Sequence, residues 1–256
     1  MDLHLQDHVI IVTGGAKGIG EGIVQVLAAE GAIPVIVGRN KEDNLATLSR
    51  IGKGFQVTAE LSDQVSCKEA VDAVIAKYGR INGLVNNAGV NDGINLEHGT
   101  YEGFMSSLHK NVVHYYLMAH YALPFLIKSK GVIVNIGSKV AETGQGGTSA
   151  YAAANGARNA LTREWAVELL KYGMRVNAVI VAECYTPLYE KWISTLPNPE
   201  ETLDKIKSKI PLGRRMTTAE EIANMVAFLL SDRSSHTTGQ LVHVDGGYVH
   251  LDRSIM

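Results

Sequence analysis

The sequence predicts a doubly wound α/β fold, in which one parallel sheet of about seven strands carries helices on both faces. Short apolar runs, such as residues 9–12 and 83–85, have the length and composition of strands that are buried on both sides. Between such runs lie longer segments whose apolar residues recur at helical spacing, as in residues 63–78. Strands and helices alternate along all 256 residues without a linker, which indicates a single domain over 1–256.

Charge and composition indicate which partners the protein is not expected to bind. Lys and Arg number 24 against 26 Asp and Glu, so no surface for nucleic acid is indicated. No apolar run reaches the ~20 residues that a transmembrane helix requires, and the first residues do not resemble a signal peptide. Cys67 and Cys184 are far apart, and His109, His114 and His120 show no metal pattern such as His-Glu-x-x-His, so we expect ordinary thiols and no metal site. We therefore expect a cytoplasmic protein with neither nucleic acid nor a membrane as partner.

The first strand, residues 9–12, leads directly into the sequence TGGAKGIG (13–20) and then into a helix. A strand, a glycine turn and a helix in this order aim free backbone N–H groups at a phosphate. Gly14, Gly18 and Gly20 would supply the tight turn, the close approach to a pyrophosphate and close packing of helix on strand. The arrangement predicts a Rossmann-type dinucleotide site, and the alternative is a glycine-rich turn without a ligand.

The end of the second strand, residues 33–37, bears on which dinucleotide is bound. An acidic residue here would bind the ribose 2′-hydroxyl of NAD, but the sequence has Gly38 followed by Arg39. Lys17 adds a second cation from the glycine turn. Two cations without a carboxylate suit a 2′-phosphate, so NADP is favoured, with NAD as the alternative. In that alternative, Arg39 stacks on adenine and Lys17 stays in solvent.

A third strand is expected over residues 57–61. Glu60 and Leu61 would then lie at the strand end, where they can flank the adenine ring of the cofactor. A helix over residues 63–78 follows and contributes apolar side chains to the core.

The fourth strand, residues 83–85, runs into the sequence NNAG (86–89). Asn side chains can hold irregular backbone at a strand end, while small residues let a ligand approach. A long helix over residues 101–128 comes next, with Asn111 in its middle. An Asn that is buried within a helix usually makes a structural hydrogen bond.

The stretch over 135–155 combines a hydroxyl, a loop of small residues and a phenol. Ser138 follows an apolar run at 131–134, and Tyr151 opens an Ala-rich segment that is expected to be helical to about residue 172. Both side chains can converge over one carbonyl or carbinol carbon. Ser138 would hold the reacting oxygen by a hydrogen bond, and Tyr151 would move its proton.

The last third of the chain completes the sheet and covers the site. Strands are expected over 174–180 and 241–244, with a helix between them that a capping box over 217–220 would open. The polar-rich residues from about 185 to 210 are expected to form a mobile lid, which would select the substrate and exclude water. The charged tail over 250–256 is expected to be exposed or to cross to a neighbouring subunit.

These motifs resemble the short-chain dehydrogenase/reductase family over essentially the whole chain. The matching positions, in family order and spacing, are Thr13, Gly14, Gly18, Ile19, Gly20, the run 86–89, Asn111, Ser138 and Tyr151. Longer stretches resemble the bacterial L-fucose dehydrogenases of that family, namely residues 84–93, 114–121, 143–146, 161–166, 211–215 and 245–253.

The resemblance implies hydride transfer between a nicotinamide and a carbinol or carbonyl carbon of a small molecule. For an L-fucose-like aldose, that reaction oxidises the anomeric hydroxyl to a lactone. Tyr151 would be the acid/base, Ser138 would orient the substrate oxygen, and Asn111 would hold a helix kink and a water in the proton path. The resemblance also implies a homotetramer that is formed through the helices over 101–128 and 151–172.

The resemblance also carries over a set of contacts. The implied cofactor-binding residues are Gly14, Lys17, Gly18, Ile19, Gly20, Arg39, Glu60, Leu61, Asn87, Ala88, Gly89, Tyr151, Asn155 and Thr186. The implied substrate-binding residues are Asn91, Ser138, Gln145, Tyr151, Glu183 and Trp192. The implied catalytic residues are Asn111, Ser138, Tyr151 and Asn155.

Asn155 is the main departure from the family pattern. The family has a lysine four residues after the tyrosine, which hydrogen-bonds the nicotinamide ribose and favours the deprotonated tyrosine by its charge. Asn155 keeps a hydrogen-bonding group without the charge. Loss of a nearby cation lowers the phenolate population by roughly tenfold to a thousandfold at neutral pH. Lys139 and Arg158 could supply charge near Tyr151, but Arg158 is expected at the surface.

Three functions stay open at this point. The first is an NADP-preferring dehydrogenase of a sugar hydroxyl, with activity reduced by Asn155. The second is a carbonyl reductase of another small ketone, and the third is a catalytically impaired relative that binds a dinucleotide. The presence of Ser138, Tyr151 and Asn111 argues against complete loss of catalysis, because a pure binder does not need that constellation.

Overall fold

The sheet has the predicted parallel, doubly wound architecture. The structure is a computed structural model that describes residues 1–252. Its seven strands are β1 (Val9–Thr13), β2 (Ile33–Gly38), β3 (Phe55–Thr58), β4 (Gly83–Asn86), β5 (Val132–Ser138), β6 (Arg175–Val181) and β7 (Leu241–Val244), in the order β3-β2-β1-β4-β5-β6-β7. The order reverses between β1 and β4, and open α/β sheets bind ligands at this reversal, beyond the carboxyl ends of the strands.

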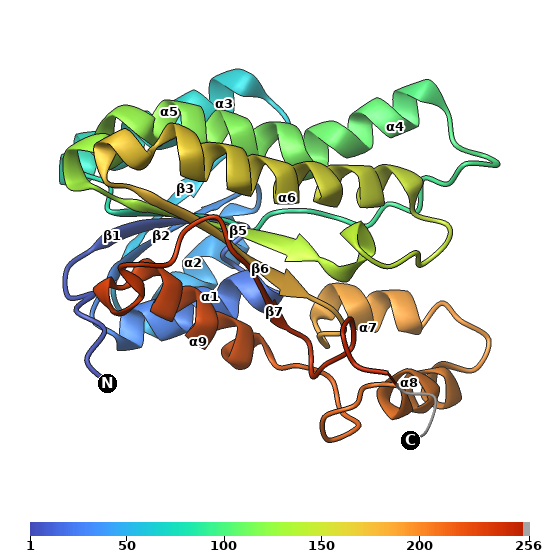
Figure 1. The fold of residues 1–256 in the computed structure, drawn as a ribbon. Coiled ribbons are helices and arrows are strands. Elements are labelled where there is room, and N and C mark those ends of the chain that lie inside the picture. The colour runs from blue at the N-terminus through green and yellow to red at the C-terminus, as the bar shows by residue number, and fades with distance from the viewer. Residues whose placement is uncertain (253–256) are drawn as a thin grey trace.

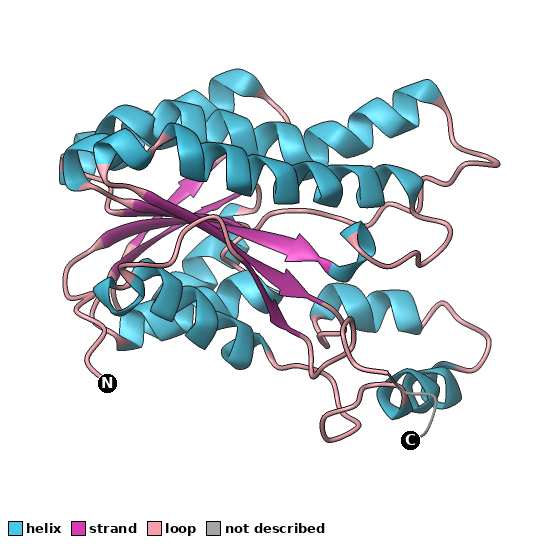
Figure 2. Ribbon diagram, viewed as in Figure 1, coloured by secondary structure: helices cyan, strands magenta, loops and turns pink. Residues whose placement is uncertain are grey.

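Helices cover both faces of the sheet (Figures 1 and 2). One face carries α3 (Gln64–Tyr78), α4 (Tyr101–Leu108), α5 (His114–Ser129) and α6 (Ser149–Glu168). The other face carries α1 (Gly18–Ala29), α2 (Lys41–Ile51) and α9 (Ala219–Leu230). Two further helices, α7 (Pro187–Ile193) and α8 (Pro199–Ser208), lie at the end of the sheet where the strand arrows point.

The inner strands β2, β1, β4, β5 and β6 are largely buried, which explains their apolar runs, whereas the edge strands β3 and β7 are only partly buried. In β1, Val9 and Ile11 belong to one hydrophobic cluster, which the helices α3, α5 and α6 complete. Ile10 and Val12 belong to a second cluster, which α1 and α9 complete. Gly22 allows α1 and α9 to approach closely, because a Cβ atom there would lie 2.9 Å from the Cβ of Ala219. The sheet is therefore held between two hydrophobic clusters, one on each face, and the site lies beyond the carboxyl ends of its strands.

Two predictions for the first half of the chain need correction. The predicted third strand over 57–61 ends too late, because β3 stops at Thr58 and a turn closed by the Asp63 N–H and the Glu60 carbonyl follows. Glu60 and Leu61 consequently lie in a loop. The helix α2 was not predicted, because few apolar residues mark it; Asn40 caps it by accepting a hydrogen bond from the N–H of Asp43 at 2.9 Å.

The helix predicted over 101–128 is interrupted. A π-helical turn, His109–Val113, separates α4 from α5 and contains Asn111. The helix predicted over 151–172 starts slightly earlier, at Ser149, and gives way to a 3₁₀ turn after Glu168. Such π turns often occur at functional sites, because they redirect backbone carbonyls from the regular ladder.

The later elements differ from the prediction in detail. The capping box lies one residue further along, at Thr218 and Glu221, because the N–H of Thr217 is bonded to the Glu183 carbonyl instead. The predicted lid region is largely helical, since it forms α7 and α8. No helix in the described part of the chain is long and apolar enough to cross a membrane. His250 is exposed as expected, whereas residues 253–256 of the predicted tail lie outside the described residues.

Candidate active site

The turn between β1 and α1 presents free backbone N–H groups. Gly14 and Gly18 have φ angles of +64° and +57°, which favour glycine, and α1 begins without a side-chain cap at Lys17. A Cβ atom at Gly20 would overlap the carbonyl oxygen of Gly14, so only glycine lets the helix start this close to the strand. The first N–H groups of α1 are therefore available to an anion.

The ends of β1 and β4 are tied together beside this turn. The hydroxyl oxygen of Thr13 accepts hydrogen bonds from the N–H groups of Asn87 and Ala88, at 2.9 and 3.1 Å. The Asn87 side chain donates to the Thr13 carbonyl at 2.9 Å. These bonds fix the backbone at the reversal of strand order, which is the expected place of the ligand.

A cleft of about 730 Å³ opens at this edge of the sheet and joins most of the predicted site residues. Every predicted cofactor-binding residue except Asn155 lines it, and so do Ser138 and Tyr151. Further lining residues that were not predicted are Gly38, Ala59, Ser62, Val90, Lys110, His114, Ile136, Gly137, Arg158, Val181, Ala182, Cys184, Pro187, Leu188 and Lys191. The cleft thus runs from the glycine turn to the hydroxyl and the phenol.

The end of the cleft near β2 has a charge arrangement that was not fully predicted. Arg39 lines the cleft, and hydrogen bonds from Ser62 lower the pKa of the Glu60 carboxyl. Lys17, however, forms an ion pair with Asp43 at 2.7 Å. Asp43 belongs to the unpredicted α2, so a carboxylate stands near the glycine turn after all and neutralises one of the two expected cations.

The other end of the cleft carries Ser138 and Tyr151. Ser138 is the last residue of β5, and its hydroxyl is directed to the N–H of Val140 at 3.5 Å. Tyr151 lies in the first turn of α6. Strand end and helix start thereby bring a hydroxyl and a phenol to one cavity wall.

Asn111 is fully buried in the π turn and connects three segments. Its amide oxygen accepts from the N–H of Val90 at 2.8 Å, and its amide nitrogen donates to the Val90 carbonyl at 2.9 Å. Its main-chain carbonyl accepts a 2.6 Å bond from Nε of Arg158. The predicted helix irregularity at Asn111 is present as the π turn. The Asn111 group that contacts α6 is its main-chain carbonyl oxygen.

Arg158 is buried, contrary to the expectation of a surface residue. It is 3% exposed and lines the cleft. Its Nη1 atom donates to the Ile136 carbonyl and to the Asn155 amide oxygen, both at 3.1 Å, and its guanidinium lies 4.2 Å from the centre of the Tyr115 ring. Within the described residues its hydrogen-bond partners are all uncharged oxygens. The site therefore contains a cation without a carboxylate beside it.

The helix geometry of α6 explains why Arg158 points inward. Residues three and four apart lie on one helix face, and Asn155, Arg158 and Thr162 are all buried on this face. Asn155 donates to the Tyr151 carbonyl at 2.9 Å and accepts from Arg158, so both ends of its amide contact protein atoms. This spacing of three and four residues is the signal in the sequence that could have identified the buried face.

Two other titratable groups on the cleft wall are held neutral. Burial, with the charge of Arg158 added, lowers the pKa of His114 to about 3. Burial raises the pKa of the Cys184 thiol to about 12, so it offers no thiolate at neutral pH. Tyr151 and Ser138 line the same cleft, where a phenol can transfer a proton and a hydroxyl can hold a reacting oxygen.

The four remaining substrate candidates lie outside the cleft lining. Glu183 is engaged in an ion pair with the buried Lys139 and accepts from the Tyr189 hydroxyl at 2.8 Å. Trp192 packs edge-on against Tyr189 on α7 and is half exposed. Asn91 and Gln145 are exposed.

The beginning of the predicted lid covers the glycine turn. Thr186 caps α7 by accepting from the N–H of Tyr189 at 3.2 Å, and a Cβ atom at Gly18 would lie 3.2 Å from the Thr186 side chain. Thr186, Pro187 and Leu188 all line the cleft. The segment after β6 thus forms one wall of the candidate site.

Comparison with known proteins identifies the family to which this fold and these residues belong. Residues 14–249 match the family described as enoyl-(acyl carrier protein) reductase, which is a group of short-chain dehydrogenases/reductases. The chain belongs to the short-chain dehydrogenase/reductase family. As in its relatives, its class of activity is NAD(P)-dependent oxidoreduction of a small molecule.

Relatives of different substrate classes cover almost the whole chain. The 3-oxoacyl-[acyl-carrier-protein] reductase of Thermotoga maritima is 36% identical over 253 residues, covering 96% of this chain and 100% of that one. The L-fucose dehydrogenase of Bos taurus is 33% identical over 240 residues, covering 93% and 88%. The crystal structure of Cj0485 dehydrogenase has a TM-score of 0.95 and 47% identity, covering 100% of this chain and 99% of that one.

Proposed function

We propose that this dehydrogenase oxidises the anomeric hydroxyl of an L-fucose-like aldose to the lactone, with NADP preferred and Tyr151 as the acid/base. The observation that carries the proposal is that Ser138 and Tyr151 line the same cleft as the glycine turn. The sugar class is supported by the L-fucose dehydrogenases among the relatives and by the stretches that resemble them.

The residues of the cleft fit a dinucleotide. The cradle that Gly14, Gly18 and Gly20 form leaves backbone N–H groups for a pyrophosphate, and any Cβ atom at Gly20 would close it. When bound, the oxidised nicotinamide supplies the acceptor for a hydride. Arg39 is the cation on the cleft wall that can hold a 2′-phosphate, because Lys17 is already paired with Asp43.

The side chains at the other end handle the oxygen and its proton. Ser138 donates a hydrogen bond to the substrate oxygen, and Tyr151 accepts the hydroxyl proton as the C–H bond gives up its hydride and the C=O bond forms. Asn111 fixes the loop at Val90 and turns a carbonyl toward α6. In the reverse direction the same phenol returns its proton to the carbonyl oxygen.

Arg158 provides the positive charge that the substitution at residue 155 removes. Its guanidinium is buried without a carboxylate partner, and Asn155 bridges it to the backbone of Tyr151. A cation in a low-dielectric site favours a nearby phenolate. We infer that this buried cation, one turn further along α6, takes the place of the charge that Asn155 lacks.

The proposed assembly is a homotetramer in the cytoplasm, formed through α4, α5 and α6. These helices and the 3₁₀ turn after α6 expose large apolar side chains, among them Tyr116, Val167 and Leu170, which are 51%, 68% and 57% exposed. Such side chains in contiguous patches mark interfaces. Light scattering of the wild type and of a Val167→Glu variant tests this, since a tetramer that uses α6 dissociates in the variant.

A carbonyl reductase of another small ketone is the second candidate, because a 3-oxoacyl reductase is among the relatives at 36% identity. One assay separates the two. Purified protein is supplied with NADP or NAD and L-fucose or related aldoses from neutral to alkaline pH, and with reduced cofactor and simple ketones, while reduced nicotinamide is followed by absorbance. Oxidation of an aldose supports the proposal. Turnover of ketones alone favours the reductase, and cofactor binding without turnover identifies a catalytically impaired relative.

A further inference from the structure

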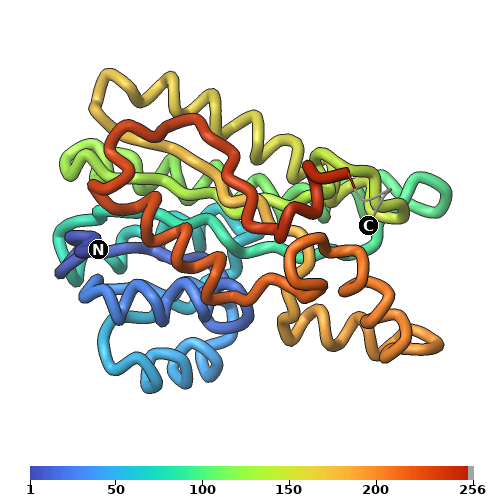
Figure 3. Tube along the Cα trace, turned by 60° about the horizontal axis from the view of Figure 1, so that its bottom comes forward, coloured from blue at the N-terminus to red at the C-terminus, as the bar shows by residue number. Residues whose placement is uncertain are grey.

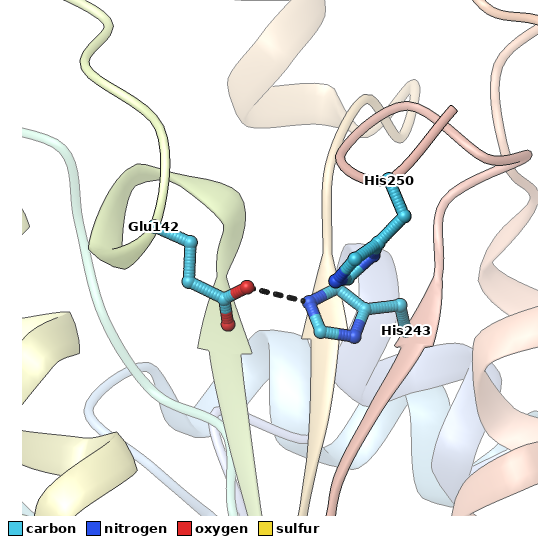
Figure 4. A group of neighbouring side chains, drawn as sticks. All are labelled: Glu142, His243 and His250. Carbon is cyan, nitrogen blue, oxygen red and sulfur yellow. Dashed lines mark hydrogen bonds and ion pairs between the residues drawn. The ribbon is translucent and has the colours of Figure 1, made fainter. Parts of the chain in front are cut away.

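We propose that Glu142, His243 and His250 form a binding site for a divalent transition metal, with Zn²⁺ the best match. The three side chains come from different segments and point toward one another (Figure 4). Glu142 follows the 3₁₀ turn Lys139–Ala141, His243 belongs to β7, and His250 lies in the turn beyond it. Their ligand atoms all lie within 4.8 Å of one another.

The distances are close to those of a coordinated ion. One carboxylate oxygen of Glu142 lies 3.0 Å from Nε2 of His243, and the two imidazole rings have centres 4.4 Å apart. Zinc bonds of about 2.0–2.2 Å in a tetrahedron place neighbouring ligand atoms about 3.3 Å apart. The first pair already meets this spacing. Only the His250 side chain would have to shift to complete the tetrahedron, and it is exposed and belongs to a turn.

The chemistry of the donors selects the class of metal. Two imidazoles and one carboxylate leave a fourth tetrahedral position open, as in His₂Glu zinc sites. Imidazole suits zinc, copper and nickel, whereas calcium and magnesium prefer oxygen ligands throughout. Glu142 and His250 are exposed and His243 is half-buried, so an ion from solvent can reach the site.

The segments that carry the ligands are held in place by bonds that do not use the ligand atoms. The Asp245 carboxylate accepts from the N–H groups of Gly247 and Val249, at 2.8 and 2.9 Å, which fixes the turn before His250. The N–H of Glu142 donates to the Lys139 carbonyl at 2.9 Å. Because these segments are already ordered, less conformational entropy is lost when they bind a metal.

The metal would fasten the C-terminal turn to the segment after β5. Figure 3 shows the C-terminal part of the tube returning to this end of the molecule, and the Glu142–His243 contact confirms the proximity. Tyr248 of the same turn lies over the ammonium group of Lys139, 4.0 Å from its ring centre, and Lys139 directly follows Ser138. The proposed role of the ion is thus to stabilise the fold beside the cleft, and it does not depend on which substrate is used.

The test uses the full chain, freed of metal with a chelator and titrated with ZnCl₂ in a calorimeter. We expect one ion per chain, and a higher melting temperature with zinc than with chelator. Glu142→Gln, His243→Ala and His250→Ala should each weaken zinc binding by more than about a hundredfold, which exceeds the loss expected for an outer-shell partner. Cobalt in place of zinc should give the intense visible absorbance of a tetrahedral site in the wild type alone.

The exposed pair of Glu97 and His98 offers a matched control, because its histidine lies 3.7 Å from a glutamate and no third ligand joins them within residues 1–252. His98→Ala should leave zinc affinity unchanged. Circular dichroism in chelator verifies that every variant is folded before titration. The proposal would be overturned by absence of zinc binding, or by binding that is equally strong in the folded His250→Ala and His243→Ala variants. The cluster would then be only a Glu142–His243 ion pair with the ring of His250 packed beside it.

Discussion

Nε of Arg158 donates a hydrogen bond of 2.6 Å to the main-chain carbonyl of Asn111. The π turn makes this contact available, because it diverts the Asn111 carbonyl toward α6. The bond joins two walls of the cleft through a buried cation. It implies that Arg158 supplies a buried positive charge to the candidate site.

Arg158→Ala should lower kcat for alcohol oxidation by about tenfold to a hundredfold, because the proposed mechanism loses the buried cation that takes the place of the missing lysine. The rising limb of the pH–rate profile should move to higher pH. Arg158→Lys keeps the charge and should retain most of the activity. Profiles of kcat against pH, with both variants checked for folding, measure the effect.

Arg163→Ala is the matched control for this prediction, because Arg163 lies on α6 and is exposed. Its profile should superimpose on that of the wild type. A loss in Arg158→Ala that is uniform across pH, and that lysine does not rescue, would assign Arg158 a purely structural role.

Asn155→Lys alone should destabilise the fold, although it restores the family residue. The new ammonium group would be buried next to Arg158 with no carboxylate to compensate it. The free energy of unfolding should fall by about 3 kcal/mol or more, as for other uncompensated buried charges. Urea unfolding measures it.

The double variant Asn155→Lys/Arg158→Ala should recover stability and activity relative to either single change, since it exchanges one cation for another. The two effects should therefore be strongly non-additive. An Asn155→Lys protein that is as stable as the wild type and more active would show that Arg158 does not already supply the charge.

The sequence was sufficient for the sheet, for the glycine turn and for the placing of Ser138 and Tyr151, because periodicity and strand ends report directly on topology. It was not sufficient where a side chain's environment depends on distant segments. Arg158 is expected at the surface from the sequence, yet it is buried because it donates hydrogen bonds to the carbonyls of Asn111 and Ile136, which are remote in sequence. The cluster of Glu142, His243 and His250 could not be predicted from the sequence either, because Glu142 and His243 are 101 residues apart in the chain.

Arg39→Ala should raise the KM for NADP by about tenfold to a hundredfold, the value of one charge-assisted hydrogen bond to the 2′-phosphate. The KM for NAD should change little. Steady-state kinetics with both cofactors at saturating substrate measure the ratio. Equal changes for the two cofactors would contradict a 2′-phosphate role.

Asp43→Asn tests the same end of the cleft in the opposite sense. It releases Lys17 from its ion pair at 2.7 Å and removes a negative charge near the glycine turn. The preference for NADP over NAD should therefore increase. No increase would mean that Lys17 does not face the 2′-phosphate even when it is free.

His114 should make the protein less stable below neutral pH. Its pKa is about 3 in the folded protein, against 6.5 for a free histidine, because it is buried beside Arg158. Between these values the unfolded chain binds a proton that the folded chain does not, so acid favours unfolding. The contribution is absent above pH 6.5, and the free energy of unfolding falls by about 1.4 kcal/mol for each unit below it.

His114→Gln removes this titration while its amide can still donate to the Lys110 carbonyl, which His114 contacts at 3.0 Å. Urea unfolding at several pH values between 7 and 5 should therefore give a shallower pH dependence in the variant than in the wild type. His120→Gln, at an exposed position of the same helix, should leave the dependence unchanged. If the two variants flatten the curve equally, the acid sensitivity does not arise from the buried imidazole of His114.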